Sequence, residues 1–379
     1  MAYVLENAAA ANDPWEGVDA DALTRAVRAQ EARPVPGIED MAAYLYAQVA
    51  DTSHRDVVGP LLDGGGASGV VVRRGTVLAA WGDPTRVEMA YSATKSVLSL
   101  VAGVAHDDGL LRLDEPVSAS LTLPQFADGH GRSVTWRHLL EQTSQWEGTL
   151  WSKPTAADAQ SAHRYAGSVG GPPGTGWAYN DVRVNLTALA LTALTARSLP
   201  DLLRERVMSE VDASASWSWH GYDTSYVEVD GSLLPVVSGG AHWGGGLWIS
   251  ALDLARIGQL CLRGGSWNGK EVLSARWIEE LWTPCRVKPD YGLSWWLNDL
   301  RTVWPAAPAT GRCARGNGGG HLLWVDPARD LVISSRWGAR VERLLAQVSA
   351  AVPECGTRPS SHGDAGGGAP GRGASVVPR

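Results

Sequence analysis

The pattern of apolar and polar positions along the chain predicts strands near both ends and helices between them. Residues 69–73 and 76–81 are rich in β-branched residues and flank Arg74-Gly75, which predicts a hairpin. Residues 292–297, 321–325 and 331–337 alternate or run apolar and predict three late strands. Helical spacing of apolar residues predicts helices over 19–33, 39–50, 92–109, 135–141, 182–196, 253–263, 274–282 and 341–351. We therefore expect an α/β (α+β) fold, in which an antiparallel sheet built from the N- and C-terminal parts is flanked by helices and carries an inserted, mainly helical region.

This order of elements divides the chain into four parts. Residues 1–109 hold the N-terminal helices, the hairpin and the helix that begins at Ser92. Residues 110–240 are predicted to be mainly helical, and residues 241–352 supply the strands and helices that complete the sheet. Residues 353–379 are rich in Gly, Pro and Ser with hardly any bulky apolar residues, so we expect a disordered tail.

Composition indicates a globular protein with enough apolar residues for a sizeable core. The chain has 379 residues, of which 44% are hydrophobic and 19% charged, and its net charge is −7. This charge argues against nucleic acid or an anionic membrane surface as a partner. No apolar run approaches the roughly 18 residues of a membrane span, and the N-terminus lacks the pattern of a signal peptide, so we expect a cytoplasmic protein. Nothing in the sequence indicates an oligomeric state.

The predicted helix over residues 92–109 carries the first candidate chemistry. Leu98, Val101 and Ala105 form its apolar stripe, and Ser92 opens its first turn. Lys95 lies three residues later, so its amine is expected on the same face as the Ser92 hydroxyl. Burial lowers the pKa of a lysine, and a neutral amine can accept the proton of a serine nucleophile. The alternative is an N-capping serine followed by a solvated lysine.

Two further stretches fit a serine–lysine site. Tyr179 follows a loop of glycines and prolines over residues 167–176, and a phenol near an ammonium group can relay a proton to a leaving group. Residues 316–320 are Gly-Asn-Gly-Gly-Gly before a predicted strand. Such a run allows close approach of the backbone and can direct an N–H group at an oxyanion. The alternatives are a packing tyrosine and a plain flexible turn.

Taken in order, these motifs resemble those of the serine β-lactamase and penicillin-binding-protein superfamily. The order is Ser92-Ala-Thr-Lys95, then a Pro-Gly segment leading to Tyr179, then a glycine-rich turn before a late strand. Residues 134–144, 244–256 and 291–296 are similar to further segments of class C β-lactamases, DD-peptidases and family VIII carboxylesterases. The resemblance covers about residues 60 to 350 and implies the fold of that superfamily.

The resemblance also implies roles for individual residues. Ser92 would be the acylated nucleophile, Lys95 its base and Tyr179 the residue that passes the proton to the leaving group. The backbone N–H groups of Ser92 and Gly320 would hold the oxyanion. The substrate would be contacted by side chains and backbone from the second and third motifs and their neighbours, namely Asp181, Asn317, Gly318, Gly319, Trp296 and His242.

Two departures from the family pattern bear on the substrate. The second motif is Tyr179-Asn180-Asp181 where the family has Asn in the third place, and Asp181 can either pair with Lys95 or accept from a substrate amine. The third motif begins with Asn317 where the family has Lys or His, which helps to hold a substrate carboxylate. We therefore expect small esters or amides that lack such a carboxylate, with hydrolysis or acyl transfer both open and poor β-lactamase activity.

Other classes of function find less support. No Gly-x-Ser-x-Gly sequence marks a Ser-His-Asp hydrolase, and no His, Cys or Asp spacing indicates a metal or another cofactor. His242 and His321 lie beside glycine turns and are expected to be structural or to contact substrate. A binding protein that kept the fold and lost turnover remains an alternative, as does a β-lactamase or DD-peptidase. If Lys95 is a neutral base, activity should rise with pH as the amine loses its proton.

Overall fold

The computed structural model describes residues 5, 13–48, 54–158, 165–167 and 170–356. The predicted disordered tail therefore lies almost entirely outside the described residues. The helices of the described part are α1 (Ala20–Glu31), α2 (Met41–Gln48), α3 (Ala93–Asp107), α4 (Trp136–Leu140), α5 (Asp181–Thr195), α6 (Leu199–Leu203), α7 (Ala251–Leu262), α8 (Ala275–Leu281) and α9 (Val341–Ala351). Short helical turns connect several of them.

A six-stranded antiparallel sheet is built from both ends of the chain, as the sequence predicts. Its order is β13-β14-β15-β16-β1-β2, so the early hairpin pairs with the last strand. The turn at Arg74-Gly75 has positive φ at both residues, which suits a two-residue hairpin. The strands are β1 (Ser68–Arg73), β2 (Thr76–Trp81), β13 (Trp296–Leu297), β14 (Arg312–Gly316), β15 (His321–Asp326) and β16 (Leu331–Arg336).

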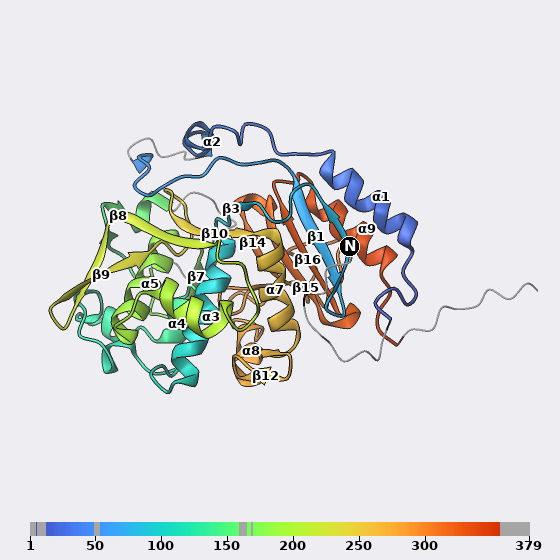
Figure 1. The fold of residues 1–379 in the computed structure, drawn as a ribbon. Helices are drawn as coiled ribbons and strands as arrows, with labels where there is room; N and C mark the ends of the chain where they lie inside the picture. The colour runs from blue at the N-terminus through green and yellow to red at the C-terminus, as the bar shows by residue number, and fades with distance from the viewer. Residues whose placement is uncertain (1–4, 6–12, 49–53, 159–164, 168–169, 357–379) are drawn as a thin grey trace, which may run out of the picture.

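Helices cover both faces of this sheet. Figure 1 shows α1 and α9 on one side of the six strands and α7 on the other, with α3 running beside β14. All six positions of β1, β15 and β16 are buried, as expected for strands enclosed between two helical layers. Helix α3, which Ser92 directly precedes, is buried along Ala93–Ala105, so it forms the centre of the molecule rather than its surface.

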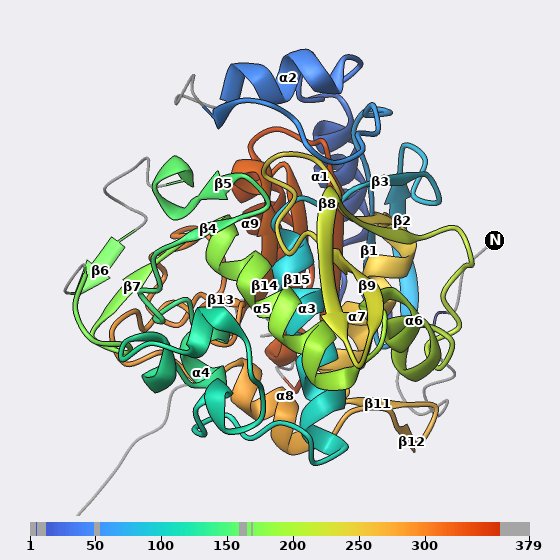
Figure 2. The same cartoon turned by 90° about the vertical axis from the view of Figure 1, so that its left-hand side faces the viewer.

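The region over residues 110–240 is not mainly helical, which corrects our expectation. It contains a long hairpin, and the hairpin joins β3 and β10 in a second sheet of order β3-β10-β8-β9. Figure 2 shows β8 and β9 beside α5, on the side of the molecule away from α9. Asp230-Gly231 at the hairpin turn, between β-branched and aromatic residues, is the signal that predicts such a hairpin. The strands are β3 (Val87–Met89), β8 (Ser218–Val229), β9 (Ser232–Val237) and β10 (Gly246–Ser250).

Three further two-stranded pairs complete the described strands. They are β4 (Thr149–Leu150) with β5 (Lys153–Pro154), β6 (Tyr165–Gly167) with β7 (Gly176–Ala178), and β11 (Ser266–Trp267) with β12 (Lys270–Glu271). None of the described helices combines the length and the apolar character that crossing a bilayer demands.

A fully buried arginine connects the two larger sheets. Arg336 on β16 donates from Nη2 to the carbonyl of Ile249 on β10 at 2.6 Å, and Nη1 lies 3.0 Å from Nδ1 of His321. Burial lowers the pKa of Arg336 to about 10, while the carboxylate of Glu88 on β3 opposes that shift. Burial and the Arg336 charge both lower the pKa of His321, which keeps its ring neutral. His321 is therefore a structural histidine of the core.

Replacing this arginine should destabilise the fold strongly. In Arg336→Met the Ile249 carbonyl loses its donor and the buried Glu88 carboxylate loses a nearby positive charge, so we expect a loss of about 3 kcal/mol or more. Urea unfolding measures the difference. Arg343→Met, at an exposed position of α9, is the matched control and should change stability by less than about 0.5 kcal/mol. Equal midpoints for the two variants would contradict the role of Arg336.

Candidate active site

Ser92 stands directly before α3 with its side chain directed at Lys95. It is partly exposed and makes no capping hydrogen bond to the helix. Its Oγ instead accepts a hydrogen bond from Nζ of Lys95 at 2.7 Å. The preceding residue, Tyr91, has φ of +50°, a conformation that costs energy in a bulky residue and is maintained by its surroundings. The alternative of a capping serine and a solvated lysine is therefore wrong.

Lys95 forms a buried ion pair with Asp181. Nζ lies 2.5 Å from Oδ1 of Asp181, and the two side chains are only 1% and 4% exposed. Asp181 is the first residue of α5, where an acidic side chain also meets the positive end of the helix dipole. The pairing of Asp181 with Lys95, one of the two roles considered for it, is the one found. Lys95 thus links the Ser92 hydroxyl to a carboxylate.

A second carboxylate and a backbone segment surround Asp181. The Asp181 N–H donates to Oδ2 of Asp158 at 2.5 Å, and Asp158 is fully buried. The backbone N–H of His242 donates to Oδ2 of Asp181 at 3.1 Å, while the His242 ring lies 3.7 Å from Asp158. His242 therefore contacts the carboxylates behind the lysine.

The pKa of Lys95 is raised, opposite to our expectation from the sequence. Burial is the largest single influence and lowers it. The charge of Asp181, the Tyr179 side chain, the hydrogen bond to Asp181 and the charge of Asp158 raise it and together outweigh burial, so the amine is held as an ammonium group. Lys95 in this state is a donor to Ser92 and cannot accept its proton unless it gives one up.

Asn180 and Gln142 fix the loop that carries Tyr179. The Asn180 side chain caps α5 by accepting from the Arg183 N–H at 3.1 Å, and it donates to the carbonyl of Thr155 at 2.8 Å. Gln142 accepts from the Asn180 N–H at 2.8 Å. The middle residue of the motif is therefore a helix cap, and its neighbours are positioned by the start of α5.

Tyr179 presents its ring to the ammonium group. Nζ of Lys95 lies 4.7 Å from the ring centroid, within the range of a cation–π interaction. Trp177, Tyr291 and Trp296 surround the tyrosine with ring centroids 5.9, 6.3 and 5.6 Å away. The structure thus brings Ser92, Lys95 and Tyr179 together and adds Trp296 to the same aromatic cluster.

The glycine run lies at the end of β14, beside the nucleophile. A Cβ on Gly316 would come within 3.1 Å of the Ser92 nitrogen. The Gly320 N–H, which we expected at the oxyanion, donates to the carbonyl of Asn317 at 3.0 Å and is thus used within its own turn. The Asn317 side chain donates to the Tyr44 hydroxyl at 2.6 Å.

The two glycines within the turn have different environments. Gly318 is exposed with φ of +65°, and nothing lies within 4 Å of a Cβ built on it. Gly319 has φ of +102° and packs against the Trp304 ring, 2.7 Å from a Cβ built there. Glycine is required at 319 by both conformation and space.

Sequence reasoning missed two residues of this site. Asp158 lies in a short segment with no motif, and its proximity to Asp181 arises only from folding. Gly240 has no side chain, and a Cβ there would lie 2.4 Å from Nζ of Lys95 and 2.3 Å from Oδ2 of Asp181. The glycine leaves the space that the ion pair occupies.

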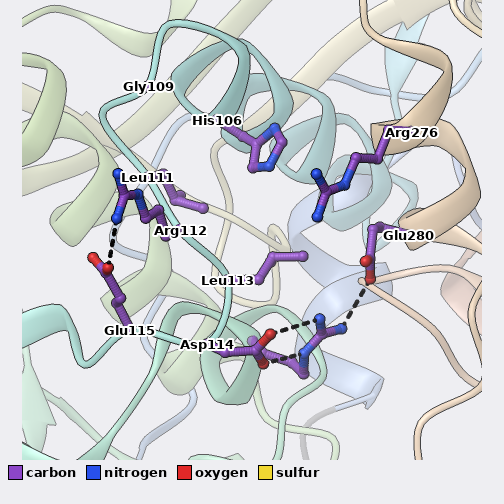
Figure 3. Close-up of a pocket in the computed structure, with 10 residues that line it drawn as sticks. His106, Gly109, Leu111, Arg112, Leu113, Asp114, Glu115, Arg276 and Glu280 are labelled. Atoms are coloured by element: carbon purple, nitrogen blue, oxygen red, sulfur yellow. Dashed lines mark hydrogen bonds and ion pairs between the residues drawn. The ribbon is translucent and has the colours of Figure 1, made fainter.

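A separate cavity of about 500 Å³ lies at the other end of α3, by His106. Its charged residues mostly pair with one another, as Figure 3 shows for Arg112 and Glu115. Arg137 likewise donates to Asp114 and Glu280. It gives no sign of a role in the serine site. In the described part of the chain, no group of three or more His, Cys, Asp or Glu side chains is placed to hold a metal ion.

Comparison with known proteins assigns the chain to a family. The family model described as Beta-lactamase matches residues 54–335, most of the chain, so the protein belongs to the beta-lactamase family. A 6-aminohexanoate-dimer hydrolase of Paenarthrobacter ureafaciens is 24% identical over 285 residues. That match covers 68% of this chain and 62% of the relative, so the chain spans less than two thirds of that relative's length.

Solved structures share the fold at low sequence identity. A penicillin-binding protein homologue from Caulobacter crescentus has a TM-score of 0.56 and 16% identity, covering 84% of this chain and 99% of its own. A beta-lactamase from Mycobacterium bovis has a TM-score of 0.52 and 20% identity, covering 75% and 94%. The fold predicted from the sequence is thereby confirmed.

The space left by Gly240 can be tested directly. In Gly240→Ala the new methyl group must displace Lys95 or Asp181, and a displacement of about 1 Å at a reacting group can cost roughly 100-fold in rate. We expect kcat/KM for an activated ester to fall by about that factor. Gly129→Ala is the control, because a Cβ there meets nothing within 4 Å. Unchanged kinetics in Gly240→Ala would show that the close packing is unimportant.

Proposed function

We propose that the protein is a serine hydrolase that cleaves small linear amides or esters through an acyl-enzyme. The observation that carries this proposal is the hydrogen-bonded chain from Ser92 through Lys95 to Asp181, with distances of 2.7 and 2.5 Å. A partly exposed hydroxyl is there connected to a buried carboxylate through one ammonium group. Membership of the beta-lactamase family supports hydrolysis as the class of reaction.

Asp181 is the final proton acceptor in this mechanism. As Oγ of Ser92 bonds to the substrate carbonyl carbon, its proton moves to Nζ of Lys95, and another Nζ proton moves to Oδ1 of Asp181. The C=O π bond breaks and its electron pair stays on the carbonyl oxygen as an oxyanion. The carboxyl is now neutral and Lys95 is still an ammonium group, so total charge is conserved. This route explains how a lysine whose pKa is raised can serve the nucleophile.

The oxyanion is formed close to positive charge. The Ser92 N–H and the retained Lys95 ammonium group are its donors in this proposal. When the C–N or C–O bond breaks, the leaving group takes a proton through the Tyr179 hydroxyl from Lys95, which recovers one from Asp181. The acyl group stays on Ser92. Attack by water, or by an amine in acyl transfer, repeats the same proton movements and releases Ser92.

The charge of Asp181 does not decide the substrate class. Asp181 was one of the two departures that led us to expect a substrate without a carboxylate, but its charge is balanced by Lys95 and buried with it. That reason for a substrate without a carboxylate therefore no longer holds. The name of the Paenarthrobacter ureafaciens relative, a 6-aminohexanoate-dimer hydrolase, supports a linear amide as substrate. We propose a small-molecule amide or ester rather than a β-lactam.

Covalent labelling tests the nucleophile. A fluorophosphonate probe should label the protein stoichiometrically at Ser92, as located by peptide mass spectrometry. Ser92→Ala should abolish labelling, and Lys95→Met should slow it by about 100-fold or more because the proton path is broken. Ser99→Ala, a serine of the same helix outside the site, is the matched control. No labelling at any pH from 6 to 10 would favour a binding protein that keeps the fold without turnover.

The position of Asp181 predicts an unusual pH profile. With the pKa of Lys95 raised, kcat/KM of the wild type for a simple ester should stay level between about pH 7 and 10. Asp181→Asn removes the main charge that raises this pKa and leaves burial, which lowers it. The variant should therefore show activity that rises with pH below the ordinary lysine pKa of 10.5.

The raised pKa of Lys95 also predicts how the free energy of unfolding depends on pH. Because the folded-state pKa lies above the value of a free lysine, the stabilisation from the charged Lys95 is present below about pH 10.5 and is lost as pH rises through the folded-state pKa. Identical pH–rate profiles for wild type and Asp181→Asn would contradict the role given to Asp181.

A further inference from the structure

Arg315 on β14 carries a guanidinium group with no ionic partner in the described part of the chain. Its central carbon lies 5.1 Å from the centroid of the Trp296 ring and 5.0 Å from that of Trp304. The side chain is partly exposed. The guanidinium group is thus held by two indole rings, and no ion pair with a carboxylate of the described residues occupies its N–H donors.

The strand that carries Arg315 also passes the nucleophile. The next residue, Gly316, faces the backbone of Ser92, so the Arg315 side chain leaves the opposite face of β14. It reaches the edge of the sheet, where β13 is the last strand. There the Trp296 ring contacts Arg315 and also lies 5.6 Å from the ring of Tyr179. The Trp296 ring therefore lies between the Arg315 guanidinium group and the Tyr179 ring, which covers Lys95.

Two aromatic contacts prepare a guanidinium group for recognition of an anion. Stacking on indole rings fixes the plane of the group and lowers the entropy lost on binding. A guanidinium group contacted through its face keeps the N–H groups of its edge, which can donate two parallel hydrogen bonds to a carboxylate. In a structural ion pair these donors are already occupied. Arg137, for example, donates to both carboxylate oxygens of Asp114.

We propose that Arg315 binds a carboxylate of the substrate, placed at the far end of a linear chain from the bond that is cleaved. This inference rests on the proposed function and makes its substrate class narrower. It reverses the expectation drawn from Asn317, because the cation absent at that residue is present two residues earlier on the same strand. A linear chain is required, since the carboxylate must pass the Trp296 ring to reach Arg315 while the reacting carbonyl lies at Ser92.

Matched pairs of substrates test this proposal. On the acyl side, the mono-p-nitrophenyl ester of adipic acid is compared with its methyl ester derivative, which replaces the negative charge by one methyl group. On the leaving side, N-acetyl-6-aminohexanoate is compared with its methyl ester. We expect the wild type to prefer the charged member of at least one pair by about tenfold in kcat/KM, mainly through KM. Arg315→Gln should reduce that ratio to near one, and Arg315→Lys should retain part of it because the charge remains.

Controls separate the possible failures. Arg276→Gln, at an exposed arginine on α8 that lies at the distant cavity (Figure 3), should keep the wild-type ratio. If the wild type shows no charge preference in either pair, or if Arg315→Gln lowers kcat/KM equally for charged and neutral members, Arg315 is structural and the proposal is wrong. If the wild type shows neither turnover nor labelling of Ser92, the proposed function itself is wrong.

Discussion

The buried contact between Lys95 and Asp181 is the constraint on which the site depends. Two opposite charges removed from water are stable only while each has its partner, so the elements that carry them must stay in register. Those elements are α3, from the first half of the chain, and α5, which follows the Tyr179 loop. The pair therefore fixes where the nucleophile helix meets the inserted region, and it holds the Ser92 hydroxyl at one end.

Sequence patterns were sufficient for the parts of this arrangement that are local. The hairpin at Arg74-Gly75, the start of α3 at Ser92 and the strands β13, β15 and β16 follow from turn residues and apolar spacing and lie within a few residues of their predicted places, whereas β14 was not predicted. The hairpin of β8 and β9 was missed because its strands alternate with polar and aromatic residues inside a region that otherwise looks helical. The Asp230-Gly231 signal was present and was outweighed by that context.

The electrostatics of the site could not be obtained from the sequence. The motif placed Ser92 beside Lys95 because three residues on a helix bring two side chains to one face. The direction of the Lys95 pKa shift depends on Asp181 and Asp158, which approach it only in the folded chain. Likewise, the Gly320 N–H was assigned from motif order, whereas its hydrogen bond to Asn317 is set by the turn itself.

Replacing a neutral amide by Asp181 changes what the lysine can do. Beside an asparagine, burial alone would favour a neutral amine that accepts a proton directly. Beside the aspartate, the amine stays charged, and in the proposed mechanism the proton of Ser92 passes through it to the carboxylate. The same charge then remains available for the oxyanion, close to the carbonyl oxygen as it becomes negative. In that mechanism the base is Asp181, one position further from the substrate than Lys95, and the lysine remains a fixed positive charge beside the reacting group.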